Sequence, residues 1–211
     1  TREDSLTTLG VGKNMVRSIR HWALATGMLQ EEPKSRGSVM RTSEVGEFLL
    51  GRTGRDPYLE DPASLWLLHW QLLAHPTKCS TWRWAFSVMH SNEFTRNSLV
   101  DGLLEAARRT GDTEPSESSV RRDAEVFIRT YLPSRSSVGP VPEDSLDCPL
   151  VELELLEESD GIFRFVRGPK ETLPDGIFAF AVADYWKRIA PDRESLSFSD
   201  LAYGLSSPGS A

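Results

Sequence analysis

A glycine-containing segment near the start of the sequence, LGVGKNMVRSIRHW (residues 9–22), raises phosphate binding as the first chemical possibility. A nucleotide-binding P-loop has the pattern G-x-x-x-x-G-K-[ST] after a buried strand, because its glycines let the backbone wrap the phosphates and its hydroxyl binds magnesium. Here Thr7 stands at the first glycine position and Asn14 at the hydroxyl position, and the preceding residues are mostly polar. The pattern is broken, so we expect no nucleotide cofactor for this protein.

The residues after Gly12 predict an amphipathic helix that ends at Gly27. Apolar side chains recur at helical spacing on one side, at Val16, Ile19 and Ala23 among others. The opposite side and its flanks carry hydrogen-bond donors, namely Lys13, Asn14, Arg17, Ser18, Arg20 and His21. A helix with this composition is typical of DNA recognition, and a helix N-terminus beside a lysine favours a DNA phosphate. An ordinary solvated surface helix is the alternative.

A basic turn and a short apolar helix follow this segment. The turn carries Lys34 and Arg36 at its tip, and the helix is predicted over residues 43–50. Helix, basic hairpin and short helix in this order indicate a winged helix-turn-helix, in which the wing contacts the DNA backbone. We therefore interpret residues 1–55 as a first winged-helix-like DNA-binding unit.

The charge distribution both supports and limits this interpretation. The chain has a net charge of −7, yet residues 10–41 carry six basic and two acidic side chains, a local balance of +4. An acidic protein binds DNA through a localised basic patch rather than a diffuse positive field. The rest of the chain is acidic, and this acidic surface is a candidate for contact with protein partners.

Residues 56–92 are predicted to form a helical connector. Asp61 and Pro62 offer a cap and a first-turn proline for a helix that is apolar on nearly every side and hence buried. A second helix begins at Ser80. His69, His75 and His90 lie in or beside these helices, and without acidic or cysteine partners at metal-ligand spacing we interpret them as core or helix-end residues.

Residues 93–211 repeat the first pattern as a second winged-helix-like unit with a C-terminal helix. Helices are predicted over residues 95–111 and 119–131, and the second exposes Arg121 and Arg122. LVELELLEE and IFRFVRG flank a turn at residues 159–161 and predict a hairpin, followed by the helix GIFAFAVADYWKRI. The acidic strand keeps a protein-binding scaffold open. The expected fold class is mainly α with small β-hairpins (α+β), as tandem winged helix-turn-helix-like units joined by a helical connector.

Neither a disulfide framework nor a membrane span is indicated. Cys79 and Cys148 stand alone, without a C-x-x-C motif, and no apolar run is long enough to cross a bilayer. A cytoplasmic protein without a membrane partner is the default expectation.

Five ordered blocks of the sequence resemble a domain-of-unknown-function family of bacterial DNA phosphorothioation operons. They are LGVGKNMVRSIRHW, EDPASLWLLHW, SSVRRDAEVFIRTY, DCPLVELELL and FSDLAYGLSSPG. The resemblance implies a DNA-nicking endonuclease of a modification and phage-defence system, which opens one strand of double-stranded DNA so that sulfur enters the backbone. It also implies partner proteins: a cysteine desulfurase, an ATPase and a sulfur transferase.

The resemblance implies an activity, but it does not identify the catalytic residues. Nucleases commonly hold a divalent metal such as magnesium or manganese between carboxylates. Glu60 and Asp61 are the one acidic pair we consider as metal ligands, although capping explains Asp61 equally. A non-catalytic winged-helix adaptor or regulator that recruits the modification proteins is the alternative function.

Overall fold

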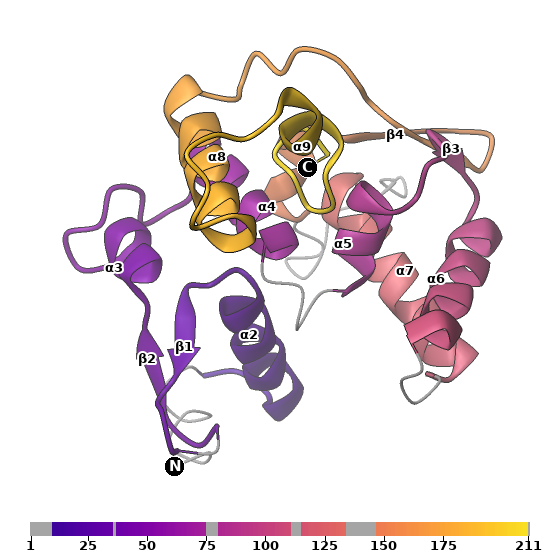
Figure 1. The fold of residues 1–211 in the computed structure, drawn as a ribbon. Coiled ribbons are helices and arrows are strands. Elements are labelled where there is room, and N and C mark those ends of the chain that lie inside the picture. The colour runs from indigo at the N-terminus through magenta and orange to yellow at the C-terminus, as the bar shows by residue number, and fades with distance from the viewer. Residues whose placement is uncertain (1–9, 36, 75–79, 111–114, 134–146, 211) are drawn as a thin grey trace.

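The computed structural model describes residues 10–35, 37–74, 80–110, 115–133 and 147–210 of the chain. It is mostly helical, with a two-stranded and a three-stranded antiparallel sheet, so the expected α+β class is confirmed. Figure 1 shows the N-terminal helix and hairpin at the lower left, the helices α6 and α7 at the right, and the C-terminal helices at the top.

The N-terminal segment folds as helix, hairpin and short helix, as the sequence predicts. Its elements are α2 (Lys13–Ala25), β1 (Leu29–Glu31), β2 (Met40–Thr42) and α3 (Glu44–Leu50). Ser43 caps α3, because its side chain accepts a hydrogen bond of 2.9 Å from the backbone N–H of Gly46. Gly46 lies so close to β1 that a Cβ there would be 2.1 Å from the Met28 carbonyl oxygen.

The connector consists of α4 (Pro62–Ala74) and α5 (Ser80–Ser87). Every residue of α4 from Ser64 to Ala74 is buried, which confirms the expectation of a helix covered on all sides. The predicted cap is also confirmed, since Asp61 Oδ1 accepts a hydrogen bond of 2.9 Å from the N–H of Ala63. This helix is the centre about which the other elements pack.

The next part of the chain surrounds a three-stranded sheet. Its elements are β3 (Glu93–Phe94), α6 (Arg96–Thr110), α7 (Glu117–Tyr131), the 3-10 helix η2 (Pro149–Leu153), β4 (Leu156–Ser159) and β5 (Ile162–Phe165). The strand order is β3-β5-β4, with both pairs antiparallel. The predicted hairpin is confirmed as β4 and β5, and its turn residues Asp160 and Gly161 have φ angles of 53° and 80°.

The segment LVELELLEE differs from the expected strand in its first half, which forms η2. Leu150 and Leu153 are both buried, at 5% and 3% exposure, a three-residue spacing that suits a 3-10 helix better than a strand. Pro149 at the start of η2 also lacks the N–H that a strand ladder needs. The strand pairing therefore begins only at Leu156.

Two helices close the described chain. They are α8 (Asp175–Ile189), which the sequence predicts, and α9 (Phe198–Tyr203), which it does not. Ser197 and Asp200 form a reciprocal capping box at the start of α9. Within the described part of the chain, no helix has the length and apolarity needed to cross a lipid bilayer.

Aromatic rings connect the N-terminal helix to the core. Trp22 of α2 meets Trp82 of α5 edge to face at a centroid distance of 5.4 Å, and Trp82 meets Phe127 of α7 at 5.7 Å. The same buried cluster contains residues from each of the three segments separated at residues 55 and 92. The division into three units stays a prediction.

Candidate nucleic-acid interface

Helix α7 has one face in the core and one face in solvent. Its buried residues are Val120, Ala124, Phe127, Ile128, Thr130 and Tyr131. On the outer face, Arg122 and Arg129 are exposed, and neither makes an ion pair with any residue that the structure describes. They are seven residues apart, which places them on the same side of the helix about 10 Å apart along its axis.

The carboxylate between these two arginines is already paired. Glu125 Oε1 accepts a hydrogen bond of 2.8 Å from Nε of Arg96 on α6. A neighbouring helix therefore compensates the charge of Glu125, whereas Asp123, the other carboxylate next to Arg122, is exposed. Arg122 and Arg129 remain the available charges of the face.

Arg121 differs from its neighbour Arg122 in its surroundings. Its guanidinium donates to Glu117 Oε1 at 2.8 Å and to Asn97 Oδ1 of α6 at 3.2 Å. The bond to Asn97 joins α7 to α6, whereas the bond to Glu117 lies within α7. Of the two arginines predicted to contact DNA, Arg122 is thus available as it stands, whereas Arg121 would have to exchange its partners.

The predicted polar face of α2 lies in solvent. Lys13, Asn14, Arg17, Ser18 and His21 are all exposed. Neither lysine nor arginine among them forms an ion pair within the described residues. The first turn contains no acidic side chain, so the positive end of the helix dipole and the two cations add to each other.

Arg20 is directed to the hairpin. Its guanidinium hydrogen-bonds the carbonyl oxygen of Gly37 and lies 3.9 Å from Glu31 Oε1. Arg20 therefore holds the hairpin against α2. Lys34 is exposed beside the turn, in a left-handed conformation with φ of 68°, and Arg36 lies outside the described residues.

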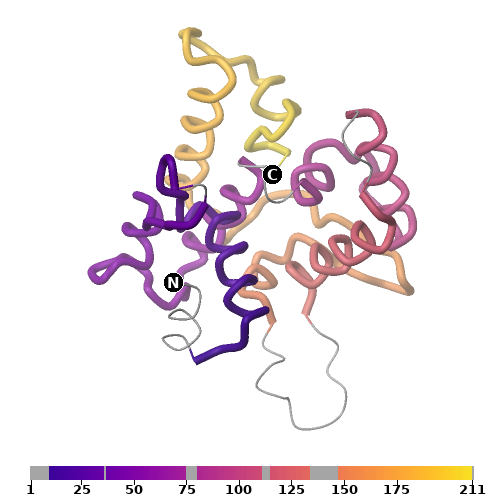
Figure 2. The backbone as a smooth tube through the Cα atoms, turned by 90° about the horizontal axis from the view of Figure 1, so that it is seen from below, coloured from indigo at the N-terminus to yellow at the C-terminus, as the bar shows by residue number. Residues whose placement is uncertain are grey.

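The two predicted DNA-binding helices approach each other at His21 and Asp123. The carboxyl of Asp123 on α7 has its pKa raised by partial desolvation, and the nearby imidazole of His21 on α2 acts in the opposite direction. Trp22 of α2 reaches α7 only indirectly, because its ring partner Trp82 of α5 in turn contacts Phe127 of α7. The view from below in Figure 2 shows α2 at the centre, beside the segments around α7.

The hairpin β4–β5 is acidic on its exposed face. Arg164 bonds Glu93 of β3 at 2.5 Å and Glu157 of β4 at 3.1 Å, and these carboxylates raise its pKa. The one arginine of this strand is thereby neutralised across the sheet. The hairpin itself offers little to a phosphate.

The described residues do not fit the divalent metal that the resemblance implies. They contain no group of three or more histidine, cysteine or acidic side chains placed to hold a metal ion. At the proposed pair, Asp61 caps α4, while the N–H groups of Glu60 and Asp61 donate to Asp56 at 2.9 Å and 3.0 Å. The capping alternative explains this geometry, and no reaction step is assigned through a metal here.

His69 is a buried histidine whose hydrogen-bonding environment the sequence does not reveal. Its side chain is 1% exposed, and Nδ1 lies 2.8 Å from the hydroxyl of Tyr131, as expected for a core histidine. Its Nε2 has no hydrogen-bond partner among the described residues. His90 is exposed, and His75 lies outside the described residues.

Comparison with known proteins gives one family and one group of solved structures. The family model for "Protein of unknown function (DUF4007)" matches residues 1–211. A crystal structure of magnesium ion-bound SspB is similar with a TM-score of 0.87 and 31% identity, and a second SspB crystal structure with 0.86 and 32%. Both comparisons cover 98% of this chain, which spans 63% of the SspB chain. No curated protein matches the sequence.

Proposed function

Because this chain belongs to the DUF4007 family, we propose that it is the DNA-binding part of a protein of a DNA phosphorothioation system. In this proposal, the outer face of α7 and the exposed end of α2 hold double-stranded DNA. The similarity to SspB, at a TM-score of 0.87, supports a place in that system. DNA as the substrate would locate the protein in the cytoplasm.

The order of elements around α7 supports a winged-helix interpretation. A winged helix has a helix, a short strand, two further helices and a hairpin, with the first strand beside the last one. The chain has this order in α5, β3, α6, α7, β4 and β5, with the 3-10 helix η2 inserted before β4 and with β3 next to β5. In such a unit the helix before the hairpin enters the major groove, and here that helix is α7.

The single observation that carries the proposal is the pair Arg122 and Arg129. Both are exposed on this helix, have no ion-pair partner among the described residues, and flank a glutamate that Arg96 neutralises. A phosphate backbone attracts unpaired cations on one helix face, and each such contact releases counterions. Lys13 and Arg17 on α2 would extend the contact.

The test is duplex binding at low salt by Arg122→Ala, Arg129→Ala and the double variant. We expect each single change to weaken binding roughly fivefold to tenfold, which corresponds to about 1 to 1.5 kcal/mol, the value of an ordinary hydrogen bond for a solvent-exposed contact. The salt dependence should also fall by about one unit of slope for each lost phosphate contact. Lys187→Ala is the control, because it removes an exposed cation of α8, which lies at the upper left in Figure 1 while α7 lies at the right. Unchanged affinity in the double variant would remove α7 from the proposed interface.

Nicking of one strand, to give sulfur access to the backbone, is the proposed reaction of the whole protein. It is supported by the family resemblance, and no described residue is assigned to the chemistry. The matching assay converts supercoiled plasmid to open circle with magnesium or manganese, using the full-length protein and its Arg122→Ala, Arg129→Ala variant. Nicking that falls in the variant would support an enzyme that α7 positions on DNA.

A non-catalytic adaptor is the second candidate, and the acidic hairpin favours it. Glu157 of β4 is exposed and bonded to Arg164, and Glu158 is half-buried. Such a surface suits a basic region of a partner, such as a cysteine desulfurase, an ATPase or a sulfur transferase of the system. Full-length protein that shifts DNA in a gel and leaves plasmid intact would favour this function.

A further inference from the structure

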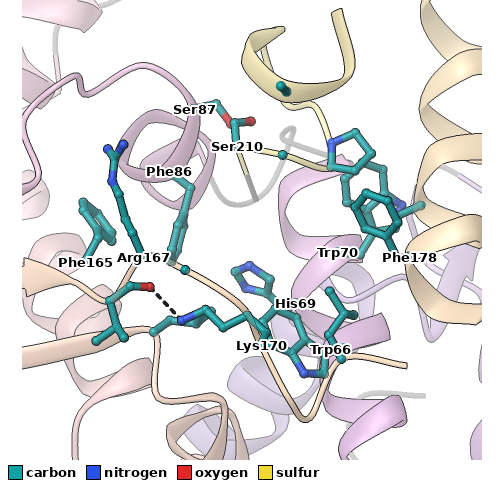
Figure 3. A pocket seen from close by; sticks show the side chains of 18 of the residues that line it. Trp66, His69, Trp70, Phe86, Ser87, Phe165, Arg167, Lys170, Phe178 and Ser210 are labelled. Carbon is teal, nitrogen blue, oxygen red and sulfur yellow. Dashed lines mark hydrogen bonds between the residues drawn. The ribbon is translucent and has the colours of Figure 1, made fainter. Parts of the chain in front are cut away.

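A cavity of about 620 Å³ opens where α4, α5, the segment between β5 and α8, α8 and the C-terminal turn meet. Ligand-binding cavities typically range from about 300 to 1,000 Å³. Figure 3 shows Trp66, Trp70 and Phe178 on one side and Phe86 and Phe165 on the other. The proposed DNA-binding face does not include this cavity.

Two tryptophans, Trp66 at 5% and Trp70 at 3% exposure, line the inner wall of the cavity, and their N–H groups are bonded elsewhere. Trp66 Nε1 donates to Thr172 Oγ1 at 3.1 Å, and Trp70 Nε1 donates to Asp184 Oδ2 at 3.0 Å. Phe178 is 44% exposed and Tyr203 80% exposed, so two further rings stand near the opening. Aromatic walls of this kind accept a flat ring by stacking.

The charge of the lining is one-sided. Its cationic side chains are Arg167 and Lys170, beside the histidines His69 and His90, and it contains no aspartate or glutamate, although acidic residues outnumber basic ones by 31 to 24 in the chain. Lys170 Nζ donates to the Val166 carbonyl oxygen at 2.7 Å, which holds the ammonium at the wall. Such a lining favours an anion over a metal cation.

One hydrogen-bonding atom of the lining is unsatisfied. His69 is 1% exposed, its Nδ1 is bonded to Tyr131, and its Nε2, on the opposite edge of the ring, has no partner in the described part of the chain. Figure 3 shows the imidazole beside Phe86 and Lys170. Buried polar atoms are nearly always paired, so this nitrogen of a lining residue is left to pair with a ligand group that displaces the atoms now covering it.

We propose that this cavity binds a nucleoside monophosphate unit, with the base against the aromatic walls and the phosphate beside Lys170 and His69. The unit comes either from a free nucleotide or from an unpaired nucleotide of a DNA strand. A flat ring joined to an anion is the one chemistry that matches both halves of the lining. The site is independent of the glycine segment at residues 9–14 and of DNA binding by α7.

The test is calorimetric titration of the chain with a deoxynucleoside 5′-monophosphate. The matching nucleoside and inorganic phosphate are titrated as separate ligands. We expect the monophosphate to bind more tightly than either part. Absence of monophosphate binding, or equal binding of inorganic phosphate, would overturn the proposal.

Two variants test whether the monophosphate binds in this cavity. Lys170→Met keeps the length of the side chain and removes its charge, and Phe178→Ala removes a ring that is already 44% exposed, so that folding is little affected. We expect each to weaken monophosphate binding roughly tenfold, the value of one charged hydrogen bond or one stacked ring. Lys187→Met, an exposed lysine of α8 outside this cavity, is the matched control. Equal loss in the control, or no loss in either cavity variant, would place the nucleotide elsewhere.

Competition with a short DNA single strand and with a blunt DNA duplex of the same sequence distinguishes a free nucleotide from an unpaired nucleotide of a DNA strand. If a strand supplies the unit, the single strand competes with the monophosphate and the duplex does not. If the source is a free nucleotide, neither competes. This outcome does not depend on Arg122 and Arg129, so failure of the proposed DNA interface and failure of the cavity are distinguished.

Discussion

Nδ1 of His69 and the hydroxyl oxygen of Tyr131 lie 2.8 Å apart, and this bond joins α4 to α7 in the core. Both side chains are 1% exposed. Burial, reinforced by the positive charge of Lys170, lowers the pKa of His69 to about 3. His69 is therefore neutral in the folded protein at neutral pH.

Stability should decrease as the pH falls through the range in which unfolded histidine takes up a proton. The unfolded chain binds that proton near pH 6.5 and the folded chain only near pH 3, so acid favours unfolding between these values. We expect the free energy of unfolding to fall by about 2 kcal/mol from pH 7 to pH 5. Urea unfolding at both pH values measures it, and His69→Gln should remove most of the difference. If the variant retained the full difference in the free energy of unfolding, other titratable side chains would be responsible for it.

Gly46→Ala should destabilise the N-terminal part of the molecule. A Cβ at this position would lie 2.1 Å from the Met28 carbonyl oxygen, which is backbone and cannot rotate away. Overpacking of this kind costs about 1 to 3 kcal/mol, and in a chain of this size 1 kcal/mol lowers Tm by about 2 °C or more. Gly176→Ala is the matched control, because nothing lies within 4 Å of its Cβ. Equal Tm values for the two variants would contradict the close packing of α3 on β1.

Arg20→Ala should loosen the hairpin without unfolding the chain. Its guanidinium joins α2 to the hairpin through the carbonyl oxygen of Gly37 and the carboxylate of Glu31. We expect faster amide hydrogen exchange in β1 and β2 and unchanged exchange in α7. Arg17→Ala, which removes an exposed arginine of the same helix, should leave the hairpin's exchange as it is.

Lys13→Ala and Arg17→Ala should weaken duplex binding while leaving the fold intact. Both side chains are exposed, and neither forms an ion pair with a described residue, so their loss removes no internal contact. Fluorescence anisotropy at several salt concentrations, with circular dichroism on the same samples, separates binding from folding. Unchanged affinity at low salt in both variants would leave α7 as the whole proposed interface.

The elements that the sequence predicts well are those whose signals are local. The helix from Lys13 to Ala25 follows from apolar spacing, its end from Gly27, and α3 from the cap at Ser43. The turn at Asp160 and Gly161 is likewise a short-range signal. Such features depend on residues within a few positions of one another, so they can be recognised in the sequence alone.

The features that escape the sequence depend on distant partners. β3 contains only Glu93 and Phe94, too short for any pattern, and it exists because β5 pairs with it. Sequence spacing also does not distinguish Arg121, which is bonded to Asn97 of α6, from Arg122, which forms no ion pair with a described residue. The lining of the cavity is drawn from separate elements, so the orphaned nitrogen of His69 has no counterpart in any motif.

The position of β3 also bears on the order in which the molecule folds. Glu93 of β3 bonds Arg164 of β5 across 71 residues of chain, whereas α6 and α7 are close in sequence and pack directly on each other. Closing so long a loop costs entropy before any contact compensates for it, and non-local pairing slows folding. During synthesis, the two helices can therefore associate while β3 still lacks its neighbour. Its exposed edge is completed only after β5 has left the ribosome.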